Sequence, residues 1–187
     1  MKKDRFVAFF DAIMAIIMTI VVLEFVIPGG TSWNDLETLL FQIIAYAVTF
    51  FYLASMWINI HDIWHDIEII SGGILWTNIV MLFFSSMIPF FTVYLGRNLS
   101  EIVPALLYGG DILLVTLSNI VSIELLSANN SQIKSNINTY RKLLAIDILI
   151  KLIGLILGIF VAAEFVLISV FVAMIFLAVF RVKTIKR

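Results

Sequence analysis

Long apolar runs with almost no charge are the feature that most constrains how this chain folds. The stretch 6–27 contains only two ionisable residues, Asp11 and Glu24, and comparable runs follow along the rest of the sequence. One crossing of a bilayer takes about 20 apolar residues. Charged residues make up 13% of the chain, compared with about 25% in soluble domains. The sequence therefore predicts an all-α integral membrane protein.

The number and spacing of these runs predict a single six-helix transmembrane domain over residues 1–187. The last run, Leu143–Phe180, is too long for one crossing, because a continuous helix would measure about 57 Å against a hydrocarbon core of about 30 Å. We therefore expect a turn near Ala162–Glu164. Pro28 is expected to stop the first helix, because proline lacks a backbone donor. The predicted helices cover about 6–27, 39–60, 70–95, 102–126, 143–161 and 164–181.

The basic residues predict the orientation, because loops on the cytoplasmic side collect Lys and Arg. With six crossings, ten of the twelve basic residues fall on one side, Arg97 lies on the opposite side and Lys151 lies inside the membrane. Both termini are therefore expected in the cytoplasm. The ten residues on that side are Lys2, Lys3, Arg5, Lys134, Arg141, Lys142, Arg181, Lys183, Lys186 and Arg187.

One face of the first helix carries branched apolar residues and a single hydroxyl. At 100° per residue, Ile16, Thr19, Ile20 and Leu23 share a stripe, and Asp11 points away from it. One interpretation is an ordinary packing or lipid-facing surface. The other is a hydrophobic constriction that gates by dewetting, followed by a layer of Thr hydroxyls that contact a partly dehydrated cation.

Polar residues on three predicted helices are expected at a similar depth in the membrane. Asp11 on the first helix, Trp57 and His61 on the second and Asn78 on the third all lie near the cytoplasmic side. Ionisable groups at such depth usually face the interior of a bundle. Arg5 is six positions from Asp11, too far round the helix for a direct pair. We expect a polar clamp that holds the first helix against the second and third.

His61 and His65 form an alternative site, because histidines four apart share a helical face and the neighbouring carboxylates would complete a metal-ligand set. The spacing is generic, and the segment His61–Glu68 falls where a solvated turn is expected. The sequence therefore favours no bound metal and no cofactor here.

A second ionisable pair lies deep in the fifth predicted helix. Asp147 and Lys151 are four residues apart, the spacing of an ion pair that lowers the cost of membrane insertion; a proton relay is the alternative. Gly154-Leu155-Ile156-Leu157-Gly158 follows in the same helix and matches the pattern that lets two helices approach closely.

Several functional classes are not indicated by the sequence. It contains no TVGYG filter, phosphate-binding loop, dinucleotide-binding loop or hydrolase nucleophile elbow, and no cysteine. We therefore expect no catalytic residues and no enzymatic activity. A net charge of −1, with the cations at helix ends, offers no basic face for a nucleic acid.

The motif residues of the first three helices resemble a known family, the endosomal and lysosomal potassium channels of the transmembrane protein 175 type, and in particular their bacterial single-repeat relatives. The first helix of that family begins with Arg-x-x-x-Phe-Ser-Asp, and here Phe10 stands in place of the serine. The matching residues are Arg5, Phe9, Asp11, Trp57, His61, Trp76, Asn78, Pro89 and Phe90.

The resemblance implies a homotetramer of six-helix subunits in which the first helix of each subunit lines a central pore. The narrowest ring maps to Ile16, with Thr19 one turn further out and Leu23 beyond it; Ile20 lies on the same stripe. It also implies that Arg5, Asp11, Trp57, His61 and Asn78 form the family's clamp, and that the membrane is a bacterial inner membrane.

The expected function is a potassium-permeable, weakly selective cation channel without cofactors, because Thr hydroxyls and apolar side chains supply fewer fixed ligands than a carbonyl filter. Glu24, near the outer mouth, would concentrate cations. The alternatives are a proton-coupled transporter of small solutes that uses Asp11, Asp111 and the Asp147–Lys151 pair, and a membrane metalloprotein built on His61 and His65.

Overall fold

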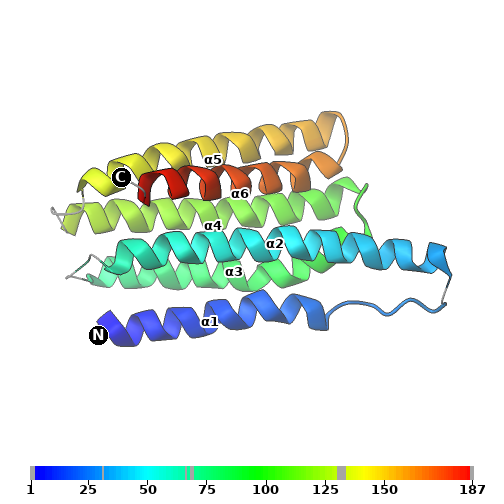
Figure 1. Ribbon diagram of the computed structural model, residues 1–187, viewed down its shortest axis with the longest axis horizontal. Helices are drawn as coiled ribbons and strands as arrows, with labels where there is room; N and C mark the ends of the chain where they lie inside the picture. Colours follow the sequence, from blue (N-terminus) through cyan, green and yellow to red (C-terminus); the bar gives the residue numbers. More distant parts are fainter. Residues whose placement is uncertain (1–2, 31, 66, 68–69, 130–133, 186–187) are drawn as a thin grey trace.

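Six long α-helices run back and forth along a common direction (Figure 1). The computed structural model describes residues 3–30, 32–65, 67, 70–129 and 134–185. The helices are α1 (Lys3–Leu23), α2 (Trp33–His65), α3 (Gly72–Arg97), α4 (Ile102–Asn129), α5 (Lys134–Phe160) and α6 (Glu164–Ile185). The chain reverses between Phe160 and Glu164, where the turn near Ala162–Glu164 was expected.

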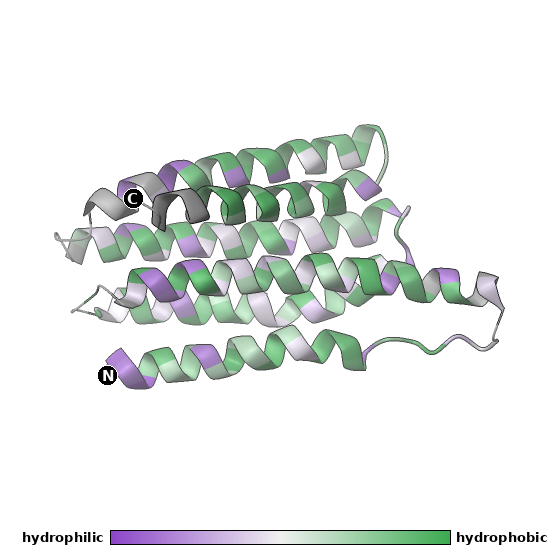
Figure 2. Ribbon diagram, viewed as in Figure 1, coloured by the Kyte–Doolittle hydropathy of each residue, from purple (hydrophilic) through white to green (hydrophobic). Residues whose placement is uncertain are grey.

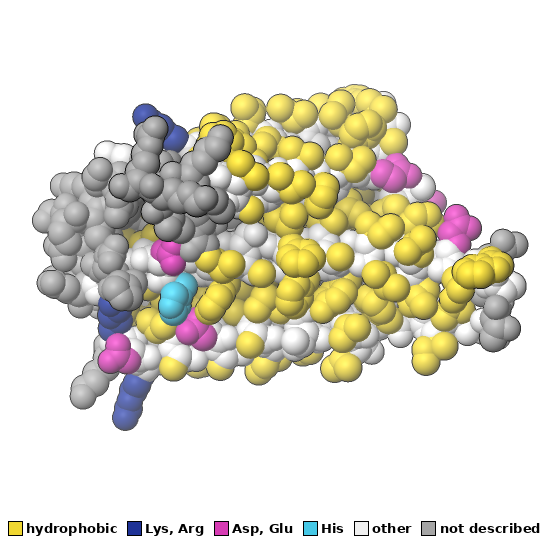
Figure 3. Space-filling model, in the orientation of Figure 1, with side chains coloured by type: hydrophobic (Ala, Val, Ile, Leu, Met, Phe, Trp, Pro, Cys, Tyr) yellow, Lys and Arg dark blue, Asp and Glu magenta, His cyan; other side chains and the backbone are white. Residues whose placement is uncertain are grey.

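Five of these helices are long and apolar enough to cross a membrane, and the sixth is apolar over the shorter segment Glu164–Phe180. Hydrophobic residues dominate the middle of every helix, whereas hydrophilic residues gather at the helix ends (Figure 2). The described side chains on the face shown in Figure 3 are mostly hydrophobic, so this face is as apolar as a lipid-facing surface requires. The predicted all-α membrane fold is confirmed.

The first helix ends four residues earlier than the predicted boundary at Ile27. α1 stops at Leu23, and Glu24 N donates to Val21 O at 3.2 Å in a tightened last turn. Pro28 explains the early end, because a proline ring collides with the carbonyl of the residue four positions before it in a helix. That residue is Glu24, so a helix that ran on through Pro28 would be broken at this turn.

The second helix is longer at both ends than the predicted segment 39–60. It begins at Trp33, inside the expected polar connection, and continues to His65, through most of the expected solvated turn. Trp64 provides the physical reason at the second end. Its side chain is almost fully buried, and its ring packs on Phe6 and Phe10 of α1, so a helical conformation there buries apolar area.

Helix α1 lies at the edge of the bundle and packs on α2 and α3 alone. On the other side, α4, α5 and α6 pack on one another, and the close approach predicted by the glycine pattern is confirmed. A Cβ atom added at Gly158 would lie 2.6 Å from Val166 Cγ2 of α6, and one added at Gly109 would lie 2.6 Å from Val166 Cγ1. The described helices α2–α6 therefore form a continuous packed bundle, with α3 against α4 and α5 against α6 as its most extensive contacts, and α1 lies at its edge.

The start of α1 and the end of α6 lie at the same end of the bundle (Figure 1), which is the arrangement that six crossings require. In the face shown in Figure 3, the described Lys and Arg side chains gather at that end. Part of the basic set used for the orientation lies outside the described residues. These are Lys2, Lys186 and Arg187, together with the side chains of Lys134, Arg181 and Lys183.

Candidate functional site

Helix α1 has two chemically similar but differently packed faces. Its buried face consists of five apolar residues at helical spacing, and the opposite face includes the predicted stripe. Ile16 is 57% exposed and Leu23 is 80% exposed, and Thr19 and Ile20 are exposed between them. The buried residues are Phe6, Phe10, Met14, Ile17 and Val21. The stripe is therefore an exposed row of three apolar side chains and one hydroxyl.

Thr19 is the polar position within this stripe, and the hydrogen of its hydroxyl is directed at its own helix. Thr19 Oγ1 lies 3.0 Å from Ala15 O and 3.1 Å from Ile16 O, so it donates to the backbone of the preceding turn. The lone pairs of Oγ1 then remain on the exposed side. A hydroxyl held in this way offers an oxygen ligand to a cation and no competing proton.

Asp11 and Trp57 join α1 to α2 through a direct hydrogen bond. Trp57 Nε1 donates to Asp11 Oδ1 at 2.7 Å, and both residues are half-buried. The Trp57 ring also lies against His61, with 5.3 Å between the ring centroids. A carboxylate acceptor makes this a charge-assisted bond, which is stronger than a neutral one. It joins α1 to α2 at this end of the bundle.

The two remaining clamp residues lie apart from this group. Asn78 is buried on α3, where its Nδ2 donates to Ile74 O at 2.7 Å and to Ser122 Oγ of α4 at 2.8 Å. Arg5 is exposed at the start of α1, and no hydrogen bond or ion pair joins it to another residue of the described ranges. The structure thus brings together three of the five predicted residues.

Phe10, which stands where the family motif has serine, packs in an aromatic cluster. Its ring meets Trp64 of α2 edge to face, with 4.8 Å between centroids, and Phe6 lies 5.3 Å from the same ring. Trp64 was not among the residues predicted to hold α1. The signal was present, because Trp64 is seven residues after Trp57 and therefore on the same face of α2. The aromatic contacts and the Asp11 bond hold the same end of α1.

The other end of α1 is held by residues of α2 and α3. Arg97 Nη2 of α3 donates to Glu24 O at 3.0 Å, which satisfies a carbonyl left free where the helix stops. Gln42 Oε1 of α2 accepts from Val26 N at 3.2 Å. From the sequence, Arg97 was placed on the outer side of the membrane, and no partner for it was predicted.

The pair Asp147 and Lys151 lies in the interior of the bundle, away from α1. Lys151 Nζ donates to Asp147 Oδ2 at 2.7 Å and to Thr116 Oγ1 of α4 at 2.8 Å, and it lies 4.6 Å from the centroid of the Tyr52 ring. Both charged side chains are nearly inaccessible. Asp111 of α4 is also buried, and within the described residues no ion pair joins it to Lys151.

The metal hypothesis concerned the segment that begins at His61. Asp66, Glu68 and the side chain of His65 lie outside the described residues. Within the side chains that the structure does describe, no group of three or more His, Asp and Glu residues is close enough to hold an ion. His61 itself stacks on Trp57.

These features define the class: an all-helical, multi-pass membrane protein whose peripheral first helix carries an exposed apolar stripe. The comparisons with known proteins confirm the resemblance found in the motif residues. A family model described as the endosomal/lysosomal potassium channel TMEM175 matches residues 5–89. This match covers α1, α2 and α3 as far as the proline within α3.

Two bacterial relatives are similar in sequence to part of the chain. Potassium channel HX13_20290 of Chryseobacterium sp. (strain P1-3) is 38% identical over 109 residues, which cover 58% of this chain and 57% of the relative. Potassium channel B446_29190 of Streptomyces collinus (strain DSM 40733 / Tue 365) is 27% identical over 104 residues, covering 54% and 50%. The chain therefore matches about half the length of these relatives.

One solved structure has the same fold. It is the crystal structure of a lysosomal potassium-selective channel TMEM175 homolog from Chamaesiphon minutus, which superimposes with a TM-score of 0.78. The match covers 95% of this chain and 96% of the other, at 23% sequence identity. The whole six-helix arrangement is thus shared, including α4–α6, where the sequence offered no motif.

Proposed function

We propose that this chain forms a potassium-permeable, weakly selective cation channel, assembled as a homotetramer in a bacterial inner membrane with both termini in the cytoplasm. The observation that carries the proposal is the exposed stripe of α1 in the fold of a potassium channel homolog. Four copies of such a stripe, arranged about a common axis, would enclose a path through the membrane. The potassium channels among the relatives support the choice of ion.

In this proposal each residue of the stripe has a distinct role. Four Ile16 side chains form the hydrophobic constriction, which excludes water in the closed state. Thr19, one turn further along α1, contacts the cation through the outward lone pairs of its hydroxyl. Ile20 and Leu23 line the wider path toward the other end. Selectivity is weak because hydroxyl groups on mobile side chains are poorer at fixing an ion's coordination than backbone carbonyls.

The clamp sets the rotation of α1 and hence which residues face the axis. Asp11 and Trp57 act directly, because their 2.7 Å hydrogen bond joins α1 to α2, and His61 acts through Trp57, whose ring it packs against within α2. Asn78 contributes indirectly, since it fixes α3, on which α1 also packs, to α4. Arg5 completes the polar group at this end of the helix.

Reconstitution in vesicles tests the proposal against the proton-coupled alternative. The purified oligomer is placed in vesicles with a potassium gradient and no pH gradient, and cation efflux is followed. A channel releases potassium without saturation and without proton movement. Flux that requires a pH gradient and saturates with a solute would contradict the channel and favour a transporter built on the buried Asp147–Lys151 pair.

The oligomeric state provides an independent check. A central pore lined by one helix per subunit requires several copies, and four is the number proposed. Native mass spectrometry in mild detergent measures it directly. A stable monomer that retains its fold would rule out the pore on α1.

A further inference from the structure

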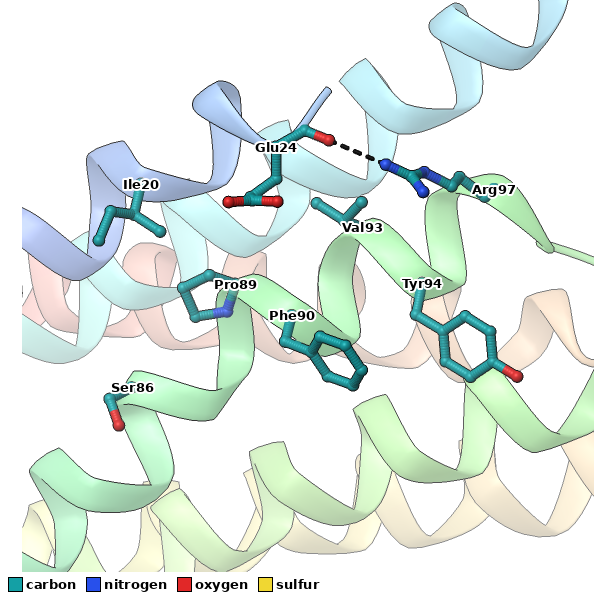
Figure 4. A pocket seen from close by; sticks show the side chains of 8 residues that line it. All are labelled: Ile20, Glu24, Ser86, Pro89, Phe90, Val93, Tyr94 and Arg97. Atoms are coloured by element: carbon teal, nitrogen blue, oxygen red, sulfur yellow. Dashed lines mark hydrogen bonds between the residues drawn. The ribbon is translucent and has the colours of Figure 1, made fainter. Parts of the chain in front are cut away.

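A cavity of about 380 Å³ opens on the side of the bundle between α1 and α3, near the end opposite the termini. Its volume falls within the range of small-molecule sites, about 300–1,000 Å³. Figure 4 shows the lining side chains, which come from both helices. They are Ile20, Glu24, Ser86, Pro89, Phe90, Val93, Tyr94 and Arg97.

Two opposite charges line this cavity without forming an ion pair with each other. Arg97 donates to the backbone carbonyl of Glu24, while the Glu24 carboxylate is directed away from the guanidinium, toward the space beside Ile20 and Val93 (Figure 4). No hydrogen bond or ion pair to the Glu24 carboxylate is found within the described residues. The cavity therefore offers one anionic and one cationic contact at the same end.

The rest of the lining is apolar and aromatic. Phe90 and Tyr94 stack with 6.3 Å between ring centroids, and Phe90 is 62% exposed. Aromatic rings of this kind attract cationic groups through their faces. Tyr94 lies near the end of α3, where tyrosines in membrane proteins sit at the level of the lipid headgroups.

An exposed apolar face of α3 continues from the cavity along the helix. Phe83, Met87 and Phe90 are exposed and lie at spacings of four and three residues, so they form one stripe. A small zwitterion bound from solution would leave these apolar side chains of α3 exposed. A lipid would cover them with an acyl chain while its headgroup occupied the polar end.

We propose that the cavity between α1 and α3 binds a phospholipid whose headgroup carries both an ammonium and a phosphate. The ammonium lies against the Glu24 carboxylate and the ring of Phe90 or Tyr94, and the phosphate binds the free donors of Arg97. Since Ile20 lines the cavity and also belongs to the proposed pore stripe, the lipid contacts the pore helix. This last consequence rests on the proposed function; the binding does not.

Lipid retention by the purified oligomer tests the site. The protein is exchanged into phosphatidylethanolamine or phosphatidylglycerol nanodiscs, and the bound lipid is counted by native mass spectrometry. We expect phosphatidylethanolamine to be retained severalfold more. Glu24→Gln removes this preference and breaks none of the described contacts, because Arg97 binds the Glu24 backbone. Arg97→Gln lowers retention of both lipids, because both carry a phosphate.

Glu101→Gln is the matched control, since Glu101 is exposed at the same end of the bundle but does not line the cavity. It should retain the wild-type preference. Equal retention of the two lipids by the wild type, or an unchanged preference in Glu24→Gln, would overturn the proposal. Neither readout uses ion flux, so failure of the lipid site and failure of the channel are distinguishable.

A single-cysteine variant separates a lipid from a neighbouring subunit as the occupant. The chain has no cysteine, so Phe90→Cys creates a unique thiol. In the delipidated oligomer a maleimide should react with it rapidly, and added phosphatidylethanolamine should slow the reaction severalfold. A thiol that is blocked with and without lipid would mean that a second copy covers the cavity. Equal labelling in both conditions would mean that no lipid binds there, and either result contradicts the proposal.

Discussion

The hydrogen bond between Trp57 and Asp11 joins the side chains of α1 and α2 directly. Among the described residues, helix α1 packs on α2 and α3, so a side-chain bond to one of these two helices is a substantial part of its attachment. The donor–acceptor distance is short, 2.7 Å, and the acceptor is a half-buried carboxylate. Loss of the donor would leave that carboxylate in a poorly solvated position.

Trp57→Phe should therefore lower the thermal stability of the oligomer by about 1 kcal/mol, the lower end of the cost of leaving a polar group without its partner, because the Asp11 carboxylate is only half-buried. Trp76→Phe is the matched control, because Trp76 is 69% exposed on α3. Melting can be followed by the loss of oligomer on size-exclusion chromatography after heating. Equal melting of the two variants would show that the indole donor contributes nothing.

The buried ion pair between Asp147 and Lys151 leads to a second prediction about single residues. Lys151→Met leaves the Asp147 carboxylate buried without its counter-charge, which costs about 3–5 kcal/mol in comparable cases. The double variant Asp147→Leu, Lys151→Met removes both charges and should recover most of the stability. Thermal denaturation of the three proteins measures the difference. A double variant as unstable as Lys151→Met would contradict a purely structural role for the pair.

At the level of single residues, the sequence predicted which polar groups lie inside the membrane but only some of their partners. The i,i+4 spacing was enough for Asp147 and Lys151, because both residues are on one helix. Asn78 was expected near Asp11, but it binds Ser122 on α4. The depth of a residue in the membrane can be predicted from the sequence. The rotation of each helix, however, is decided by packing, and this rotation selects the partner of each side chain.

Among the helices, the fit of α5 against α6 depends on two glycines. Gly154 faces Ser169 and the Phe165 carbonyl so closely that an added Cβ would overlap the Ser169 side chain. Ser169 cannot easily turn away, because its Oγ already donates to Val166 O at 2.7 Å. The Gly154 backbone therefore packs directly against the Ser169 side chain, and no flexible group there can move aside for a larger residue.

Gly154→Ala should destabilise the fold by about 1–3 kcal/mol, the usual cost of overpacking. Gly110→Ala is the control, because nothing lies within 4 Å of the Cβ position at Gly110. It should be neutral or slightly stabilising, since alanine favours the helix by about 1 kcal/mol over glycine. Thermal denaturation in the same detergent compares them. If Gly154→Ala melts no lower than Gly110→Ala, the close approach of α5 and α6 does not limit stability.

Helix positions follow from hydropathy, whereas the helix ends are set by contacts that the sequence pattern does not contain. The end of α1 at Leu23 reflects the steric reach of Pro28 and the capture of the Glu24 carbonyl by Arg97. The extension of α2 to His65 reflects the burial of Trp64 against Phe6. The end of α1 and the extension of α2 both depend on residues that lie in another helix or several positions away in the sequence.

For the whole molecule, the arrangement of helices explains how a first helix with an exposed stripe remains part of a stable fold. Helices α2–α6 pack on one another, and α1 is held to α2 and α3 by an aromatic cluster at one end and by Arg97 at the other. The stripe between these attachments is largely exposed. No family motif was identified in the segments of α4–α6, yet the shared fold extends over them.

The most direct test of the pore on α1 is the potassium current of the purified oligomer in planar bilayers, compared between Ile16→Asn and Ile153→Asn. Ile153 is exposed on α5, which does not touch α1, so the same chemical change is made far from the stripe. We expect a potassium current in the wild type and an unchanged current in Ile153→Asn. In Ile16→Asn we expect a severalfold larger and less selective current, because an amide keeps the constriction wet. A wild type without cation current, or an Ile16→Asn current equal to that of Ile153→Asn, would contradict the proposed pore on α1.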